Sequence, residues 1–210
     1  LLRHTEGRYQ EHKPNETAEV FESFMNMEDD LVVRNVPSAQ GLVLVGTFNG
    51  IGGARRALEI VGIEPALYIS IESDGECAQV VWRTWQSRVS FGLVEGVSVE
   101  ELRTSLATVP TLELGLVVAG PPCQGFSGLN RDWKGFKDSR SDGIPQLVSL
   151  IQKLKEAGPN IEWNCLAENV ASMTSIDMSD ITEHLGKIAP TWPLHLDAAL
   201  FGHVNRPRVY

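Results

Sequence analysis

From residue 41 onward the sequence alternates short apolar runs with segments of helical periodicity, and this alternation is the strongest constraint on the fold. The apolar runs are continuous and rich in Val, Leu and Ile, which is typical of strands buried in a parallel sheet. The predicted strands span residues 42–45, 66–71, 90–94, 114–119, 163–167 and 194–197, and the predicted helices span residues 54–61, 77–82, 99–106, 143–156 and 181–188. Strand–helix–strand repetition predicts an α/β fold with a doubly wound, mostly parallel sheet and helices on both faces.

Residues 1–40 differ from the rest of the chain because they are polar and acidic. Asn15 could cap a helix over residues 15–27, which would carry an apolar stripe at helical spacing. The simplest interpretation of that helix is a structural one, packed on the flank of a domain. We therefore predict an N-terminal acidic extension, residues 1–40, followed by one domain, residues 41–210.

The bulk composition excludes several classes of protein. No apolar run approaches the roughly 20 residues that span a bilayer, and the start of the chain has no signal-peptide pattern. The three cysteines are widely spaced, without metal-ligand spacing, so we expect a reducing compartment, no disulfide framework and no metal site. The formal net charge is −9 and no segment is strongly basic, so a self-sufficient DNA-binding surface is not expected.

A glycine-rich turn follows the first predicted strand and precedes a helix. Glycines in this position let the backbone turn sharply and let a ligand approach closely. Glu72 comes about 20 residues later, at the end of the next strand, where an acidic side chain can bind both hydroxyls of a ribose. The turn lacks the GxGxxG spacing of a pyrophosphate site, so it favours S-adenosyl-L-methionine over a nicotinamide dinucleotide; a tight turn without a ligand is the alternative. The turn consists of Phe48, Asn49, Gly50, Ile51, Gly52 and Gly53.

A second turn, Gly120-Pro121-Pro122-Cys123, follows the strand predicted at 114–119. Proline fixes φ and donates no hydrogen bond, so the pair of prolines ends the strand and stiffens the turn. Cys123 is thereby held at the carboxyl end of a strand, the edge where open α/β sheets bind ligands. The alternative is that Cys123 is a small buried apolar residue, as many free cysteines are.

The order of these blocks resembles the cytosine-C5 DNA methyltransferases over about residues 41–210. The resemblance rests on the glycine-rich turn, then Glu72, then the Pro-Pro-Cys-Gln block, then Glu168-Asn169-Val170, and last Arg206-Pro207-Arg208. Residues 134–138 and 179–185 look most like the small de novo-type eukaryotic enzymes. The resemblance implies a Rossmann-like S-adenosylmethionine-dependent methyltransferase fold, in which the chain transfers methyl to C5 of cytosine in DNA.

The resemblance also implies a role for each block. Cys123 would add to C6 of a flipped cytosine, and Glu168 would contact N3 and the exocyclic amine and donate a proton there. Arg206, with Arg208 behind it, would hold the O2 side of the base and a nearby phosphate. Without the resemblance, Glu168 could be an ordinary exposed acid and the two arginines ordinary surface residues. The other residues assigned to the cofactor are Ser73, Glu95, Gly120 and Pro122.

The chain departs from the family pattern at several positions. Val204 stands where the family has glutamine, Ser73 where it has an aromatic residue, Glu95 where it has Asp, and Gly143-Ile144 where it has Leu-Phe. The family's recognition domain and final helix are expected beyond the arginine block and are not found in residues 41–210. DNA binding is therefore expected to need a partner subunit or a downstream recognition domain.

Two other functions stay open at this level. The chain could be a non-catalytic regulatory paralogue that stabilises an active partner, or it could methylate cytosine in tRNA by the same chemistry. A nicotinamide dehydrogenase is disfavoured because the pyrophosphate glycines are missing. For a DNA methyltransferase we expect a nuclear protein in a eukaryote and a cytoplasmic one otherwise.

Overall fold

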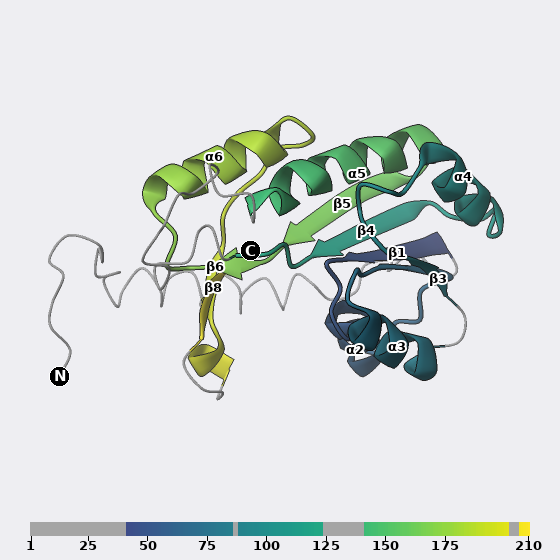
Figure 1. Ribbon diagram of the computed structural model, residues 1–210, viewed down its shortest axis with the longest axis horizontal. Helices are drawn as coiled ribbons and strands as arrows, with labels where there is room; N and C mark the ends of the chain where they lie inside the picture. The colour runs from purple at the N-terminus through teal and green to yellow at the C-terminus, as the bar shows by residue number, and fades with distance from the viewer. Residues whose placement is uncertain (1–40, 86–87, 124–140, 202–205) are drawn as a thin grey trace, which may run out of the picture. The chain divides into compact units, whose positions relative to one another are not determined.

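The computed structural model describes residues 41–85, 88–123, 141–201 and 206–210 (Figure 1). The predicted helix at 15–27 and the blocks at 124–127 and 134–138 lie outside the described residues. The strands are β1 (Leu42–Thr47), β2 (Leu67–Ile71), β3 (Val89–Phe91), β4 (Leu114–Ala119), β5 (Glu162–Ala167), β6 (Asn169–Val170), β7 (His195–Asp197) and β8 (Pro207–Val209). The helices are α2 (Gly53–Ile60), α3 (Gly75–Thr84), α4 (Val99–Ala107), α5 (Gly143–Ala157), α6 (Ser175–Gly186) and the short 3₁₀ helix η4 (Ala198–Phe201).

The main sheet has five parallel strands in the order β3-β2-β1-β4-β5, with β1 at its centre. In this register Val45 lies opposite Ile69 of β2 on one side and Val117 of β4 on the other. The strand order reverses direction between β1 and β4, and ligands of open α/β sheets bind outside the carboxyl ends of strands at such a reversal. The doubly wound parallel sheet predicted from the sequence is confirmed.

Helices cover both faces of this sheet, α2 and α3 on one side and α4 and α5 on the other (Figure 1). Side chains alternate across β1, so Val43 and Val45 join the core with α4 and α5, and Leu44 packs in the cluster that includes Val81 of α3. The larger core includes five residues of α5 that recur at helical spacing: Leu147, Leu150, Ile151, Leu154 and Ala157. Burial on both faces explains why β1, in which every residue is buried, is almost continuously apolar in sequence.

A second, antiparallel sheet follows β5 and has the order β6-β8-β7. Val170 of β6 lies opposite Arg208 of β8, and Arg208 also lies opposite Leu196 of β7. The last ladder continues by one pair, because Leu194 and Tyr210 exchange two backbone hydrogen bonds of 2.8 Å. This small sheet therefore carries the chain from the end of β5 to the arginine block.

Two elements differ from their predicted bounds by three residues or more at one end. The strand predicted at 90–94 was wrong at its end, because β3 stops at Phe91 and residues 93–97 form turns closed by bonds from Gly96 N to Leu93 O and from Val97 N to Val94 O. The last helix, predicted at 181–188, begins at Ser175 because Thr174 and Asp177 form a capping box. Among the helices in the described ranges, none is long and apolar enough to cross a membrane.

Candidate active site

Four strands of the main sheet deliver a predicted site residue or turn to the same edge. The glycine-rich turn follows β1, Glu72 follows β2, the double-proline turn follows β4 and Glu168 follows β5. Backbone hydrogen bonds carry the sheet up to these turns, because Gly120 N donates to Thr47 O at 3.3 Å and Glu168 N donates to Ala119 O at 2.8 Å. Parallel strands end at a common edge, so the sequence blocks converge in space.

The glycine-rich turn has a strained backbone. Phe48 (φ 49°), Gly50 (φ 52°) and Gly52 (φ 87°) occupy the left-handed region, and Phe48 is the one non-glycine residue found there within the described ranges. A Cβ on Gly52 would lie 2.4 Å from the ring of Trp85, so this position excludes a side chain. A Cβ on Gly50 would meet nothing within 4 Å, which leaves that side of the turn open to a ligand.

Glu72 holds this turn in place through its carboxylate. One oxygen accepts a hydrogen bond from Gly50 N at 2.6 Å, and the other accepts from Asp74 N at 2.8 Å. Asp74 in turn caps α3, because its side chain accepts from the backbone of Glu76 and Cys77, and these bonds lower the pKa of Asp74. A carboxylate offers about four lone-pair sites, so about two remain on Glu72 for a ribose diol. The Gly50 N–H is already used and is not free for a pyrophosphate.

The other predicted cofactor residues differ in exposure and in where their side chains point. Ile51 is 62% exposed on the turn, and Ser73 is exposed next to Glu72. Asn49 points its side chain away from the turn's open side, because its amide donates to Tyr68 Oη at 2.6 Å and to Ser70 Oγ at 2.9 Å. Glu95 is exposed in the turn that follows β3. Gly53 begins α2, with Gly52 as its N-cap residue.

The double-proline turn is packed against the start of α5. Pro121 is buried, and Pro122 is exposed. A Cβ on Gly143, the first residue of α5, would lie 2.9 Å from Pro121 Cβ and 2.9 Å from Pro122 Cδ. This contact gives a physical reason for glycine at a position where the family resemblance expected leucine. Cys123, a free thiol of intermediate exposure, follows the turn directly.

Glu168 and Arg208 form an ion pair between Glu168 Oε1 and Arg208 Nε, with side-chain exposures of 35% and 22%. The antiparallel pairing of Val170 with Arg208 places the two partners side by side. A Cβ on Gly120 would lie 3.9 Å from Glu168 Oε2, so Glu168 borders the turn that carries Cys123.

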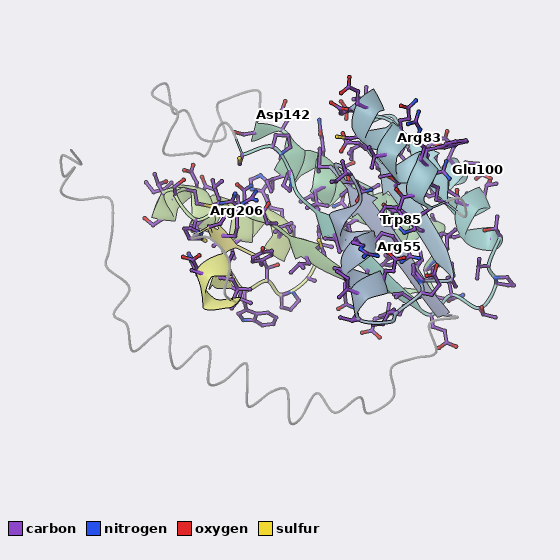
Figure 2. The ribbon with its side chains drawn as sticks, turned by 90° about the horizontal axis from the view of Figure 1, so that it is seen from below. Arg55, Arg83, Trp85, Glu100, Asp142 and Arg206 are labelled. Atoms are coloured by element: carbon purple, nitrogen blue, oxygen red, sulfur yellow. The ribbon has the colours of Figure 1, made fainter. Side chains whose placement is uncertain are left out.

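Arg206 is placed differently from Arg208, although the sequence analysis put it first. Its backbone N–H donates to Asp197 Oδ1 at 2.8 Å and the residue is exposed (Figure 2). The structure therefore brings together Glu168, Arg208 and the Cys123 turn, and assigns the contact with Glu168 to the second arginine of the block.

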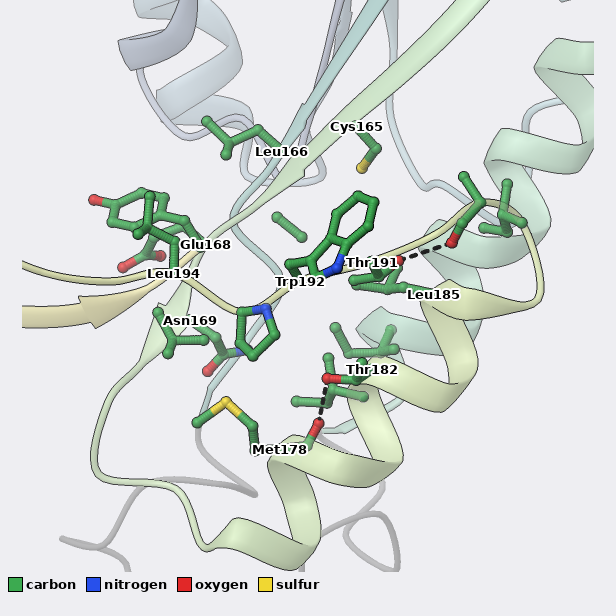
Figure 3. A pocket seen from close by; sticks show the side chains of 18 of the residues that line it. Cys165, Leu166, Glu168, Asn169, Met178, Thr182, Leu185, Thr191, Trp192 and Leu194 are labelled. Atoms are coloured by element: carbon green, nitrogen blue, oxygen red, sulfur yellow. Dashed lines mark hydrogen bonds between the residues drawn. The ribbon is translucent and has the colours of Figure 1, made fainter. Parts of the chain in front are cut away.

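An apolar cavity of about 400 Å³ lies between β5, α6 and residues 189–194, and Glu168 forms part of its lining (Figure 3). Trp192 borders it and is 78% exposed. Cys165 also borders it and is exposed. No sequence motif pointed to this cavity, because its walls come from separate apolar segments of β5 and α6.

Comparison with solved structures identifies the class of the fold. The Entamoeba histolytica methyltransferase EhMeth matches with a TM-score of 0.56 and 17% identity, over 80% of this chain and 52% of that one. The Dnmt2 methyltransferase of S. pombe matches with a TM-score of 0.53 and 16% identity, over 80% of this chain and 48% of that one. The chain has the Rossmann-like fold of S-adenosylmethionine-dependent methyltransferases, as the sequence analysis predicted.

The family model of the C-5 cytosine-specific DNA methylases matches residues 43–191, and the chain belongs to this family. DNA (cytosine-5)-methyltransferase DRM2 of Oryza sativa subsp. japonica is 33% identical over 120 residues, which are 55% of this chain and 20% of the relative. Probable inactive DNA (cytosine-5)-methyltransferase DRM3 of Arabidopsis thaliana is 38% identical over 68 residues, which are 32% of this chain and 9% of the relative. The matched parts thus span a fifth or less of these plant proteins, and the chain spans about half of the solved structures.

Proposed function

We propose that the protein transfers a methyl group from S-adenosylmethionine to C5 of cytosine in DNA, through a covalent bond between Cys123 and C6 of the base. The observation that supports this most is the convergence at one sheet edge: Glu168, paired with Arg208, borders the Cys123 turn, and the Glu72 turn lies at the same edge. A regulatory or purely structural domain does not require all of these groups together.

The residues around Glu72 fit the cofactor. Glu72 keeps unused acceptor sites for the ribose hydroxyls, and the open side of Gly50 leaves room for the ligand to approach the backbone. Ser73 and Ile51 would border the adenosine from the two neighbouring turns. When bound, S-adenosylmethionine supplies the methyl group as an electrophile.

The chain's own residues would activate the base. The thiolate of Cys123 forms a bond to C6 and shifts ring electrons toward C5, which makes C5 nucleophilic. Glu168 would hold N3 and the exocyclic amine and donate the proton that neutralises the ring. After methylation, solvent takes the C5 proton, the C5=C6 double bond re-forms as the S–C6 bond breaks, and N3 returns its proton to Glu168, which restores both residues. Arg208 would keep the Glu168 carboxyl oriented while Arg206, exposed beside β8, would meet a phosphate.

A cytosine in duplex DNA must leave the base stack to reach Cys123, so base flipping is part of this proposal. The net charge of −9 means that this chain supplies few of the cations that bind phosphates. We propose that a partner subunit or a recognition domain completes DNA binding. In a eukaryotic cell a DNA substrate would place the protein in the nucleus.

The test is methyl transfer from tritiated S-adenosylmethionine to duplex DNA and, separately, to tRNA. At low salt and with DNA in large excess, which offset its weak DNA binding, the parent chain should label DNA. Cys123→Ser should label neither substrate, and Cys77→Ser should behave as the parent because Cys77 lies on α3. Duplex DNA with 5-fluorocytosine should trap a covalent adduct with the parent, because fluorine at C5 cannot leave as a proton does. Transfer by Cys123→Ser at the parent rate would refute the assignment, and labelling of tRNA alone would change the substrate.

A non-catalytic regulatory paralogue is the second candidate, favoured by the similarity to a plant protein named as probably inactive. That function predicts cofactor binding without methyl transfer and without an adduct on 5-fluorocytosine DNA. The same experiments therefore separate the two functions.

A further inference from the structure

One face of β2 is directed at the glycine-rich turn. Residues of a strand alternate between faces, so Tyr68, Ser70 and Glu72 share one face. All three contact the turn: Tyr68 and Ser70 accept the two hydrogen bonds of the Asn49 amide, at 2.6 and 2.9 Å, and Glu72 accepts from Gly50 N at 2.6 Å. Two consecutive residues of the turn are thus attached to β2 and to the residue that follows it.

The contact with Asn49 is enclosed. Tyr68 and Ser70 are each 2% exposed, so water does not compete for their hydroxyl groups. Gly46 of β1 gives the amide its space, because a Cβ there would lie 2.3 Å from Asn49 Oδ1. Burial also raises the pKa of Tyr68, so its hydroxyl stays protonated over the working range of most enzymes. The Asn49 side chain therefore has one arrangement in this site.

Trp85 packs against the same cluster, next to Tyr68 and Gly52. Its ring meets Tyr68 edge-on, with centroids 6.0 Å apart, and excludes any side chain at Gly52. Arg55 of α2 lies 5.8 Å from the Trp85 ring (Figure 2). Tyr68, Ser70 and Trp85 therefore support the turn and leave the space beside Gly50 open for a ligand.

We propose that Asn49, Tyr68 and Ser70 are positioning residues for the cofactor, which hold the Gly50 N–H on Glu72 and so aim the remaining acceptor sites of the carboxylate at the ribose. The proposal rests on the function proposed above. Asn49 precedes Gly50 directly, so release of its amide from β2 frees the peptide between them to rotate. Gly50 N then leaves Glu72, and the carboxylate loses one of the two bonds that fix its orientation.

The test compares two ligands, S-adenosylhomocysteine and its 2′-deoxy analogue, by calorimetry on the full chain. The variants are Tyr68→Phe and Ser70→Ala, which each remove one hydroxyl and little volume, and the double variant. The preference of the parent for the ribose over the deoxyribose ligand should fall by about 2- to 10-fold, the worth of one hydrogen bond. Ser105→Ala, which removes a buried hydroxyl that donates to Glu101 O within α4, is the matched control and should keep the parent preference.

A merely structural role would weaken both ligands alike and leave their ratio unchanged. An unchanged ratio in all three variants, with parent binding intact, would overturn the proposal while the proposed function stands. Failure of the parent itself to bind S-adenosylhomocysteine would instead refute the proposed function. Rescue is also expected: Ser70→Thr keeps a hydroxyl and should keep the parent ratio.

Discussion

The ion pair between Glu168 and Arg208 offers the sharpest test, because the block that carries it contains its own control. Arg208→Ala removes the guanidinium from Glu168, whereas Arg206→Ala removes an exposed arginine two residues away on the same segment. Both changes delete one positive charge. A difference in stability between them therefore reports the contact with Glu168.

The magnitude follows from the exposure of the two partners. Exposed ion pairs contribute about 0–1 kcal/mol and breaking a buried pair costs about 3–5 kcal/mol. With exposures of 22% and 35% this pair lies between these limits. We expect Arg208→Ala to lower the free energy of unfolding by about 1–2 kcal/mol, a fall in Tm of about 2–8 °C for a chain of this size. Arg206→Ala should stay within about 0.5 kcal/mol, as ordinary surface changes do.

Thermal and urea unfolding would measure both values at low and high salt. The Arg208 effect should shrink as salt rises, because the pair is partly solvent-exposed. A Glu168→Gln variant and the double variant with Arg208→Ala complete a cycle that isolates the pair. Equal losses for the two arginine variants, or a coupling energy near zero, would show that Arg208 does not hold Glu168.

Two further regions and the DNA affinity give independent predictions. Glu72→Gln should weaken S-adenosylmethionine and S-adenosylhomocysteine equally, by about 1.5–3 kcal/mol in calorimetry, because the contact is to ribose; an unchanged Kd for either would remove Glu72 from the site. Thr174→Ala should lower stability by about 1 kcal/mol through loss of the α6 cap with Asp177, measured as a Tm against the parent. Fluorescence polarisation should show weak binding of duplex DNA, with a log–log salt slope no steeper than about −4, and tight binding with a steeper slope would contradict the charge argument.

The centre of the sheet could be predicted because β1 and β2 are buried on both faces. The strand at Leu114–Ala119 and the end of β2 at Ile71 match the expected bounds, since continuous apolar runs mark such strands directly. The capping box at Thr174 and Asp177 was a readable signal for the start of α6, and the apolar pattern alone placed that start too late. The two-residue strand Asn169–Val170 was not predicted, because it has no apolar alternation of its own.

The site was predictable as a set of strand ends but not as a set of contacts. Sequence order could not decide which arginine meets Glu168, because that choice depends on the antiparallel register of β6 and β8. The contacts of the Asn49 side chain were also out of reach, since its partners lie about 20 residues away on another strand. The alternation of Tyr68, Ser70 and Glu72 was the one available signal that polar groups face the turn from β2.

The cavity beside β5 has a consequence for handling the purified protein. β5 is the last strand of the main sheet, and within the described ranges no strand pairs with its outer edge. Leu166 is 44% exposed on that strand and Trp192 is 78% exposed across the cavity. An open, apolar edge is a template for adding strands from other molecules, so concentrated samples should associate through this side. A charged residue in place of the exposed Leu166 should make the chain more soluble, because a charge on the open edge of β5 opposes edge-to-edge pairing.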